Sequence, residues 1–251
     1  MNILAFSVDC NYVKYAIALM RSIKQHDVTA KVICRGISLK DKHKQMIHDV
    51  SDNITFIDDK TQLSEARTLM KTYHDPAETF WTYKGDVYSL QGLEKVQKTM
   101  YSPHAAYACH SRFKTIIELL ESSEHEKLLC LDADTIVNRN FDHLWETNNY
   151  DLCVVPSGED QSLFHNEGLL LINNTLNSQE YFQTIHDKIF HEGKFLEWDA
   201  DTEILSETYQ PTRLNIQKID KTYKDKQHNP ESYMWSGDGP RKKSSKFKQK
   251  L

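Results

Sequence analysis

The sequence predicts an α/β fold with a Rossmann-like sheet, mixed but mainly parallel, flanked by helices. One observation favours this class, and a second indicates a single domain. Short apolar runs alternate with segments of helical periodicity over the first 60 residues, which is typical of a parallel sheet. The chain has 251 residues, of which 39% are hydrophobic and 27% charged, enough for one globular domain that needs no disulfides.

The N-terminal segments follow the order β-α-β-α-β. Ile3–Val8 is a short apolar run, as expected of a buried strand. Apolar residues then recur at helical spacing over residues 12–23, which predicts an amphipathic helix. AKVICRGI and NITFID predict two more strands, with a helix over residues 40–50 between them that Ser38 would cap.

The rest of the chain predicts further strands and helices after one less regular segment. Residues 60–105 are rich in Tyr, Trp, Thr and charge, and we expect helix and irregular structure there, either a lid or acceptor-binding insertion or an ordinarily packed lobe. Beyond it the pattern predicts a helix through Phe113, strands in LLCLDADTIV, DLCVVP and GLLLINN, a helix in YFQTIHDKIF, a helical patch at Ile204 and a strand in RLNIQKI. We therefore expect one domain over residues 1–240.

The charge is unevenly distributed. The net charge is −5, yet residues 241–251, RKKSSKFKQKL, carry six Lys or Arg and no acid. An acidic body with a basic end does not favour nucleic-acid binding. We expect residues 241–251 to form a disordered tail, or else a weak contact with an anionic membrane surface or a polyphosphate.

Cysteine usage and the lack of targeting patterns predict a cytoplasmic protein. The five cysteines form no CxxC pair, which indicates free thiols in a reducing compartment. The first residues show no basic region or cleavage pattern of a signal peptide, and no apolar run reaches the length of a membrane span.

The segment LLCLDADTIV carries the strongest chemical signal. Asp132 and Asp134 would point the same way if they extended a buried strand, since strand residues i and i+2 share a face. Two uncompensated carboxylates at such a strand end would repel each other and be costly to desolvate. A divalent cation removes both problems, and hard oxygen ligands suit Mg²⁺ or Mn²⁺. The pair therefore predicts a site for a metal–diphosphate.

Other interpretations of this pair have less support. Aspartyl-phosphate hydrolases of the haloacid dehalogenase type place Thr four residues after the first Asp, where this chain has Ile136. The chain has a second DxD at Asp199 and Asp201, and such pairs are also common at solvated turns. No GxGxxG, GxxxxGK[ST] or HExxH occurs, so the common dinucleotide, P-loop and zincin sites are not predicted.

Six segments, taken in order, resemble glycosyltransferase family 8, the group that contains glycogenin and bacterial lipopolysaccharide galactosyltransferases. The segments are FSVDCNYVKYA, SRFKTIIELL, LLCLDADTIV, HNEGLLLINN, DADTEIL and MWSGDGPRKK. The resemblance spans residues 1–243 and implies the GT-A fold. It also implies transfer of a hexose from a nucleotide sugar, in this case a UDP-sugar, to an acceptor hydroxyl of a glycan, a lipid-linked carrier or a protein, with retention at the anomeric carbon and with Mn²⁺ or Mg²⁺ as cofactor.

The resemblance implies roles for individual residues. The nucleoside would be bound by Ser7, Asp9, Asn11 and Tyr12, with Asp132 and Ala133 nearby. The metal would be held by Asp132 and Asp134, and the diphosphate would lie against Gly237, Arg241 and Lys242. The residues acting at the donor sugar would be Asn166, Glu167 and Asp201, and Arg112 would reach either the sugar or the diphosphate.

Three positions depart from the family pattern. Met234 stands where the family has a third metal ligand, a His, and a thioether suits Mn²⁺ poorly, so Asp238, His228 or water would have to replace it. Thr202 replaces a Gln. Glu167 replaces a small residue and could be an acceptor contact, a structural ion pair or a base, and a base behind the sugar would invert the anomeric carbon.

Two other functions remain open from the sequence. Met234 and Thr202 favour a non-catalytic relative that binds a nucleotide sugar without turning it over. The DxD pair alone would also fit a Mg²⁺-dependent phosphohydrolase.

Overall fold

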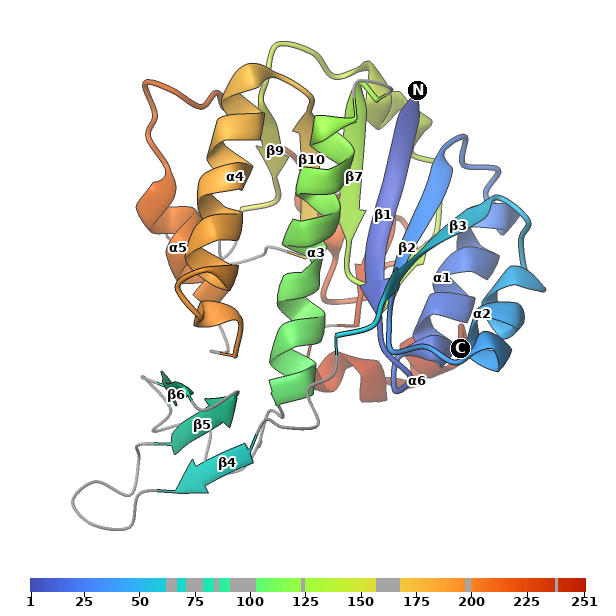
Figure 1. The fold of residues 1–251 in the computed structure, drawn as a ribbon. Helices are drawn as coiled ribbons and strands as arrows, with labels where there is room; N and C mark the ends of the chain where they lie inside the picture. The colour runs from blue at the N-terminus through green and yellow to red at the C-terminus, as the bar shows by residue number, and fades with distance from the viewer. Residues whose placement is uncertain are drawn as a thin grey trace.

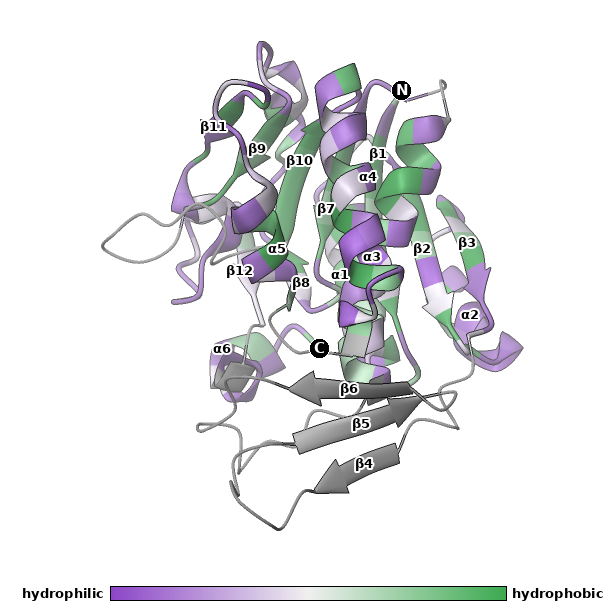
Figure 2. Cartoon of the chain, turned by 60° about the vertical axis from the view of Figure 1, so that its left-hand side comes forward, coloured by the Kyte–Doolittle hydropathy of each residue, from purple (hydrophilic) through white to green (hydrophobic). Residues whose placement is uncertain are grey.

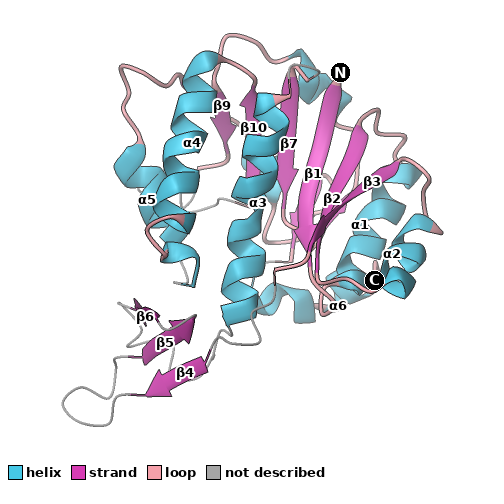
Figure 3. Ribbon diagram, viewed as in Figure 1, coloured by secondary structure: helices cyan, strands magenta, loops and turns pink. Residues whose placement is uncertain are grey.

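The computed structural model describes residues 1–61, 103–122, 125–156, 168–196, 200–237 and 239–251, together with three strand backbones within residues 67–90. Its centre is a seven-stranded sheet with helices on both faces (Figure 1, Figure 3). The strands are β1 (Asn2–Val8), β2 (Lys31–Ile37), β3 (Ile54–Asp59), β7 (Lys127–Leu131), β9 (Leu152–Val154), β10 (Leu169–Asn173) and β11 (Ile216–Lys218).

The sheet has the order β11-β9-β10-β7-β1-β2-β3. β1 pairs in parallel with β2 and β7, β2 with β3, and β9 with β11, whereas β10 runs antiparallel to both β7 and β9. The predicted α/β fold with a mixed, mainly parallel sheet is confirmed. Parallel strands end at the same edge of a sheet, so the loops after β1 and β7 lie close together and can share one ligand.

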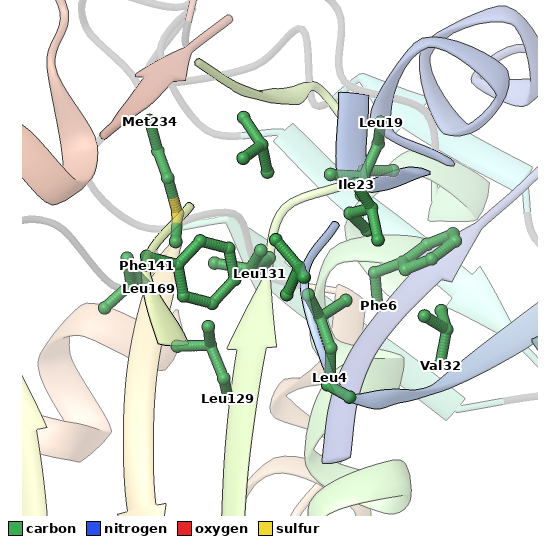
Figure 4. Packing of buried hydrophobic residues seen from close by; sticks show 14 of the residues in the cluster. Leu4, Phe6, Leu19, Ile23, Val32, Leu129, Leu131, Phe141, Leu169 and Met234 are labelled. Carbon is green, nitrogen blue, oxygen red and sulfur yellow. The ribbon is translucent and has the colours of Figure 1, made fainter. Parts of the chain in front are cut away.

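Helices cover the two faces of the sheet and define two cores. They are α1 (Val13–Gln25), α2 (Asp41–His48), α3 (Pro103–Glu121), α4 (Leu176–Phe190) and α5 (Ala200–Thr208). Alternate residues of β1 separate the cores: Ile3 and Ala5 pack with α3, α4 and α5, and Leu4 and Phe6 pack with α1 and α2. Figure 4 shows the second core, and in Figure 2 the strands between the helices are mostly apolar.

The segment LLCLDADTIV forms two strands instead of the single predicted strand. β7 ends at Leu131, and β8 (Thr135–Val137) leaves the main sheet to pair with β12 (Met234–Ser236), which the sequence pattern did not predict. Between them the chain turns, and Thr135 N donates to Asp132 O at 3.1 Å. The two aspartates therefore lie in a turn at the C-terminal end of a buried strand, and strand alternation does not set their directions.

The expected cap of α2 was wrong. The residue that precedes the helix is Lys40, with extended backbone. Ser38 instead has a φ of 50°, in the left-handed region, and its N–H donates to Asp59 O at 2.8 Å. Ser38 therefore closes the turn after β2 and does not begin the helix.

The basic C-terminal segment is packed against the domain. A short 3-10 helix (Gly239–Lys243) leads into α6 (Ser245–Lys248), which Ser244 caps by accepting a hydrogen bond from Phe247 N. Phe247 is fully buried in a small cluster with Ala18, Ile136 and Trp235. The disordered tail expected over residues 241–251 is therefore not what the structure shows, because an aromatic residue within the basic run anchors it.

Residues 67–90 hold three strands that form an antiparallel sheet of their own, which the expected helix and irregular structure did not include. They are β4 (Arg67–Met70), β5 (Thr79–Tyr83) and β6 (Asp86–Leu90), in the order β4-β5-β6. Their side chains lie outside the described residues, so the lid or acceptor role stays a prediction. Within the described ranges, no helix combines the length and apolar character that crossing a bilayer requires.

Candidate active site

The carboxylate pair lies at the edge of the main sheet, in the turn after β7. Asp134 is 6% exposed, and its carbonyl oxygen accepts a hydrogen bond from Gly237 N at 2.9 Å. Burial, followed by the nearby charge of Asp132, raises the pKa of Asp134 above its usual range, although Lys242 lies against it and opposes this. A buried carboxyl next to a second carboxylate needs positive charge close to it to stay ionised.

Three cationic side chains from distant parts of the chain surround the pair. Lys242 Nζ lies 2.7 Å from Asp134 Oδ2, and Lys224 Nζ lies 3.7 Å from Asp132 Oδ2. Arg112 Nη1, from α3, lies 3.3 Å from Asp132 Oδ1. Both carboxylates are therefore paired with cationic side chains of the same chain. The sequence did not predict these ion pairs.

Gly168 allows one of these contacts. It lies just before β10, and its carbonyl oxygen accepts a hydrogen bond from Asp132 N at 3.0 Å. A Cβ atom at Gly168 would overlap both Asp132 Oδ2 and Lys224 Nζ. The Asp132 carboxylate and the Lys224 ammonium thus occupy the space that any other side chain at position 168 would fill.

Asp201 is tied to the same cluster through Arg112. It lies in the first turn of α5, is 4% exposed, and forms a buried ion pair with Arg112 Nη2. Its Oδ1 accepts from Thr202 N at 3.0 Å and lies 3.8 Å from His110 Nε2. Burial alone would raise the pKa of Asp201, but Arg112 and His110 outweigh burial and hold the pKa well below its usual range. Asp201 is therefore ionised and can only accept hydrogen bonds.

The loop after β1 is held by Asp9, which is 4% exposed. Asp9 Oδ1 accepts from Asn11 N at 3.0 Å and from Tyr12 N at 3.1 Å, and Oδ2 lies 3.2 Å from His104 Nε2. Burial would raise the pKa of Asp9, but the hydrogen bonds from His104 and Asn11 outweigh it and lower the pKa. Ser7 Oγ is buried and has no hydrogen-bond partner among the described residues, which leaves it available to a ligand.

Lys242 connects this loop to the carboxylate pair. Its ammonium lies 2.5 Å from Tyr12 Oη and 4.4 Å from the centre of the Tyr12 ring, while also binding Asp134. Burial would lower the pKa of Lys242, but Asp134 outweighs it and raises the pKa. The predicted nucleoside and diphosphate positions are therefore adjacent, as one bound nucleotide requires.

Three other residues predicted to bind the nucleotide differ in how far they are buried in the protein. Ala133 is 6% exposed and its side chain packs in the second core, so only its backbone could meet a ligand. A Cβ atom at Gly237 would come within 2.8 Å of both Asp134 O and Phe247 Cζ, so this glycine is required by the packing of the chain itself. Arg241 is half-buried on the same short helix as Lys242.

The described residues offer no third ligand for a metal at the pair. Met234 is fully buried in the second core, next to Phe141 (Figure 4). His228 is also buried, with Nδ1 2.9 Å from Ser244 Oγ and Nε2 2.9 Å from Ser236 O, so both of its ring nitrogens are occupied. Across the ranges that the structure covers, no further His, Cys, Asp or Glu completes a three-ligand cluster with the two aspartates.

Some predicted site residues lie outside the described residues, and some site residues were not predicted. Asn166, Glu167 and Asp238 are among the former, so their roles stay predictions. The sequence did not predict Lys224, His104 and His110 as site residues, because no local motif marks them. Gly168 could have been found, because it is the glycine of the strand segment HNEGLLLINN.

Comparison with solved structures shows the fold. The structure is similar to that of the galactosyltransferase LgtC in complex with donor and acceptor sugar analogues, at 15% identity and a TM-score of 0.60, covering 96% of this chain and 88% of that one. It is similar to the glycosyltransferase GlyE of Streptococcus pneumoniae TIGR4, at 16% identity and a TM-score of 0.57, covering 95% of this chain and 55% of that one. These neighbours are GT-A glycosyltransferases, so the predicted fold is confirmed.

Sequence comparison shows the family. No curated protein matches the chain. The model of glycosyl transferase family 8 matches residues 3–224, which include the loop after β1, the carboxylate pair, Asp201 and Lys224. The match covers most of the chain and the site residues up to Lys224, and we conclude that this protein is a glycosyltransferase that belongs to glycosyl transferase family 8.

Proposed function

We propose that the enzyme transfers a hexose from a UDP-sugar to an acceptor hydroxyl. The observation that carries this proposal is Lys242, whose ammonium contacts both Tyr12 and Asp134. Tyr12 belongs to the loop predicted to bind the nucleoside, and Asp134 to the turn predicted to bind the diphosphate. A nucleoside diphosphate bound from Tyr12 to Asp134 would contact the base-binding loop at one end and the cationic cluster at the other.

The cationic cluster would stabilise the leaving group. The bond that breaks joins the anomeric carbon to the diphosphate, so negative charge develops on the departing phosphate oxygen. Lys242 and Lys224 are held in place before the reaction by Asp134 and Asp132, and preorganised charge of this kind lowers the barrier where charge develops.

Asp201 would orient the donor sugar. Its ion pair with Arg112 keeps it ionised, so it accepts hydrogen bonds from sugar hydroxyls. Its lowered pKa makes it a weak base, so it would not take the proton of the acceptor. The diphosphate itself can take that proton if the acceptor attacks from the leaving-group side, which retains the anomeric configuration. Inversion would need a base on the opposite side, for which Glu167 is the candidate.

The described residues do not fit a resident Mn²⁺ or Mg²⁺, the cofactor that the family resemblance implies. Carboxylate oxygens are suitable donors for either ion. However, in the described part of the chain only Asp132 and Asp134 are at hand, and each is already paired with a cationic side chain. We therefore assign no step of the mechanism to a metal.

The experiment that tests the proposal is thermal unfolding with UDP, with GDP and with neither, in Mn²⁺ and in chelator. A ligand that binds the native state raises the unfolding midpoint by mass action. We expect UDP to raise it under at least one condition, and GDP to raise it less. Release of UDP from UDP-hexoses, followed over glycan, lipid-linked and protein acceptors, then separates an enzyme from a non-catalytic binder. No shift with UDP under either condition would refute the proposed function.

A further inference from the structure

The charges around the carboxylate pair balance without a metal. In a site of this kind one divalent cation would bring two positive charges to two carboxylates. Here Lys242 lies on Asp134, and Lys224 lies on Asp132, which also brings two positive charges to two carboxylates. Arg112 forms its closer contact with Asp201 and so matches a third carboxylate. The repulsion that predicted a metal is therefore opposed by cationic side chains of the chain itself.

The two lysines are built into the site. The Lys224 side chain is 8% exposed and the Lys242 side chain 19% exposed, although lysine side chains are usually solvated. Lys224 ends a 3-10 turn, Lys221–Lys224, whose Thr222 N–H donates to the capping side chain of Asp220 at 2.8 Å. The next residue, Asp225, bridges to Trp235 of β12, which fixes the turn against the strand that pairs with β8.

An ammonium group can connect a carboxylate to a phosphate as a cation does. It has three N–H donors in a tetrahedral arrangement and no acceptor. Lys242 directs two of them at Asp134 Oδ2 and Tyr12 Oη, at 2.7 Å and 2.5 Å. Its remaining donor, and those of Lys224 that do not point at Asp132, can bind phosphate oxygens through charge-assisted hydrogen bonds.

We propose that Lys224 and Lys242 replace the divalent cation, so that this enzyme binds the diphosphate of its donor without a metal. The inference rests on the proposed function, because it concerns the same nucleotide site. It explains why Met234 can lie in the core and why both ring nitrogens of His228 are engaged elsewhere. A site that holds its donor with two ammonium groups has no use for a third metal ligand.

The test is the affinity for UDP, measured by calorimetry in chelator and in Mn²⁺, for the wild type and for Lys224→Met, Lys242→Met and Lys221→Met. We expect the wild type to bind UDP equally well in both buffers. Lys224→Met and Lys242→Met should each bind about tenfold or more weakly in chelator, the effect of losing a charge-assisted contact. Lys221→Met should not change, since Lys221 is exposed on the same turn.

Lys224→Met has a second expected outcome. It leaves Asp132 with less compensating charge, so Mn²⁺ should restore UDP binding to this variant while having no effect on the wild type. Lys224→Arg keeps the charge and should bind UDP in chelator better than Lys224→Met, which provides a comparison if the methionine variant folds poorly.

The outcomes separate the two proposals. Wild-type binding that requires Mn²⁺ would overturn the replacement of the metal and leave the proposed function standing. Binding in chelator that survives both lysine substitutions would overturn the role of the lysines. Absence of UDP binding in both buffers would instead refute the proposed function itself.

Discussion

Replacing Arg112 by Met should destabilise the protein strongly. Arg112 is 6% exposed and forms ion pairs with Asp201 and Asp132. Among the described residues, Asp201 without the guanidinium would keep Thr202 N at 3.0 Å, the weak thiol contact of Cys109 at 3.9 Å and the ring of His110 at 3.8 Å. A carboxylate that is 4% exposed would then be buried with too little compensating charge.

The size of the effect follows from this burial. Removing one partner of a buried ion pair costs about 3–5 kcal/mol, because the other charge stays desolvated. For a protein of this length each kcal/mol lowers the melting midpoint by about 2–4 °C, so we expect a decrease of about 6–20 °C. Arg213→Met is the matched control, since Arg213 is exposed and its removal should cost well under about 1 kcal/mol.

The pH dependence of this effect has a definite sign. In the wild type the pKa of Asp201 is lowered, so its contribution to stability is present above the ordinary pKa and is lost as the pH falls through the folded-state pKa. In Arg112→Met, burial without the guanidinium raises the pKa of Asp201, so the folded variant retains a proton that the unfolded chain releases. The difference in midpoint between variant and wild type should therefore be larger at pH 8 than at pH 5.

Thermal unfolding followed by circular dichroism, at both pH values, measures this directly. Adding Asp201→Asn to Arg112→Met should recover part of the lost stability, because it removes the uncompensated charge. A midpoint for Arg112→Met that matches the Arg213→Met control at both pH values would refute the reasoning, since it would mean that Asp201 does not depend on Arg112.

Three further predictions concern other parts of the site. Phe247→Ala should lower the free energy of unfolding in urea by about 3–5 kcal/mol, the cost of emptying a buried aromatic site, and an unchanged value would mean that residues 241–251 do not pack on the domain. Gly168→Ala should cost about 1–3 kcal/mol in the same assay through overlap with Asp132 and Lys224, and a neutral result would contradict that contact. The hydrogen bond to Asp9 raises the pKa of His104, so the stability of this pair is present below pH about 6.5 and is lost as the pH rises through the raised value. An NMR titration of His104 should give a pKa above the ordinary one in the wild type, and a lower value in Asp9→Asn.

The sequence predicts the fold well where the signal is local. The strand Ile3–Val8 and the helix after it were predicted from periodicity, and the structure has them as Asn2–Val8 and Val13–Gln25. β12 was not predicted because nothing in its three residues marks a strand. It exists because Met234 pairs with Val137, far away in the chain, and such pairing leaves no local pattern.

The site was predicted only in part, because contacts between distant segments leave no local pattern in the sequence. The position of Asp132 and Asp134 followed from the apolar run before them, but the idea that strand alternation aligns them was wrong, since they lie in a turn. Their pairing with Lys224 and Lys242 depends on the tertiary fold. A lysine in a polar segment looks the same in sequence whether it is solvated or enters a site.

The close contact at Gly168 links three positions that evolution could not change independently. A side chain at position 168 would displace both the Asp132 carboxylate and the Lys224 ammonium. A relative that acquired a larger residue there would have to move the Asp132 carboxylate as well as the Lys224 ammonium, so loss of the lysine alone would not free position 168. Aligned relatives should therefore depart from glycine at position 168 only where the residues at both 132 and 224 have also changed.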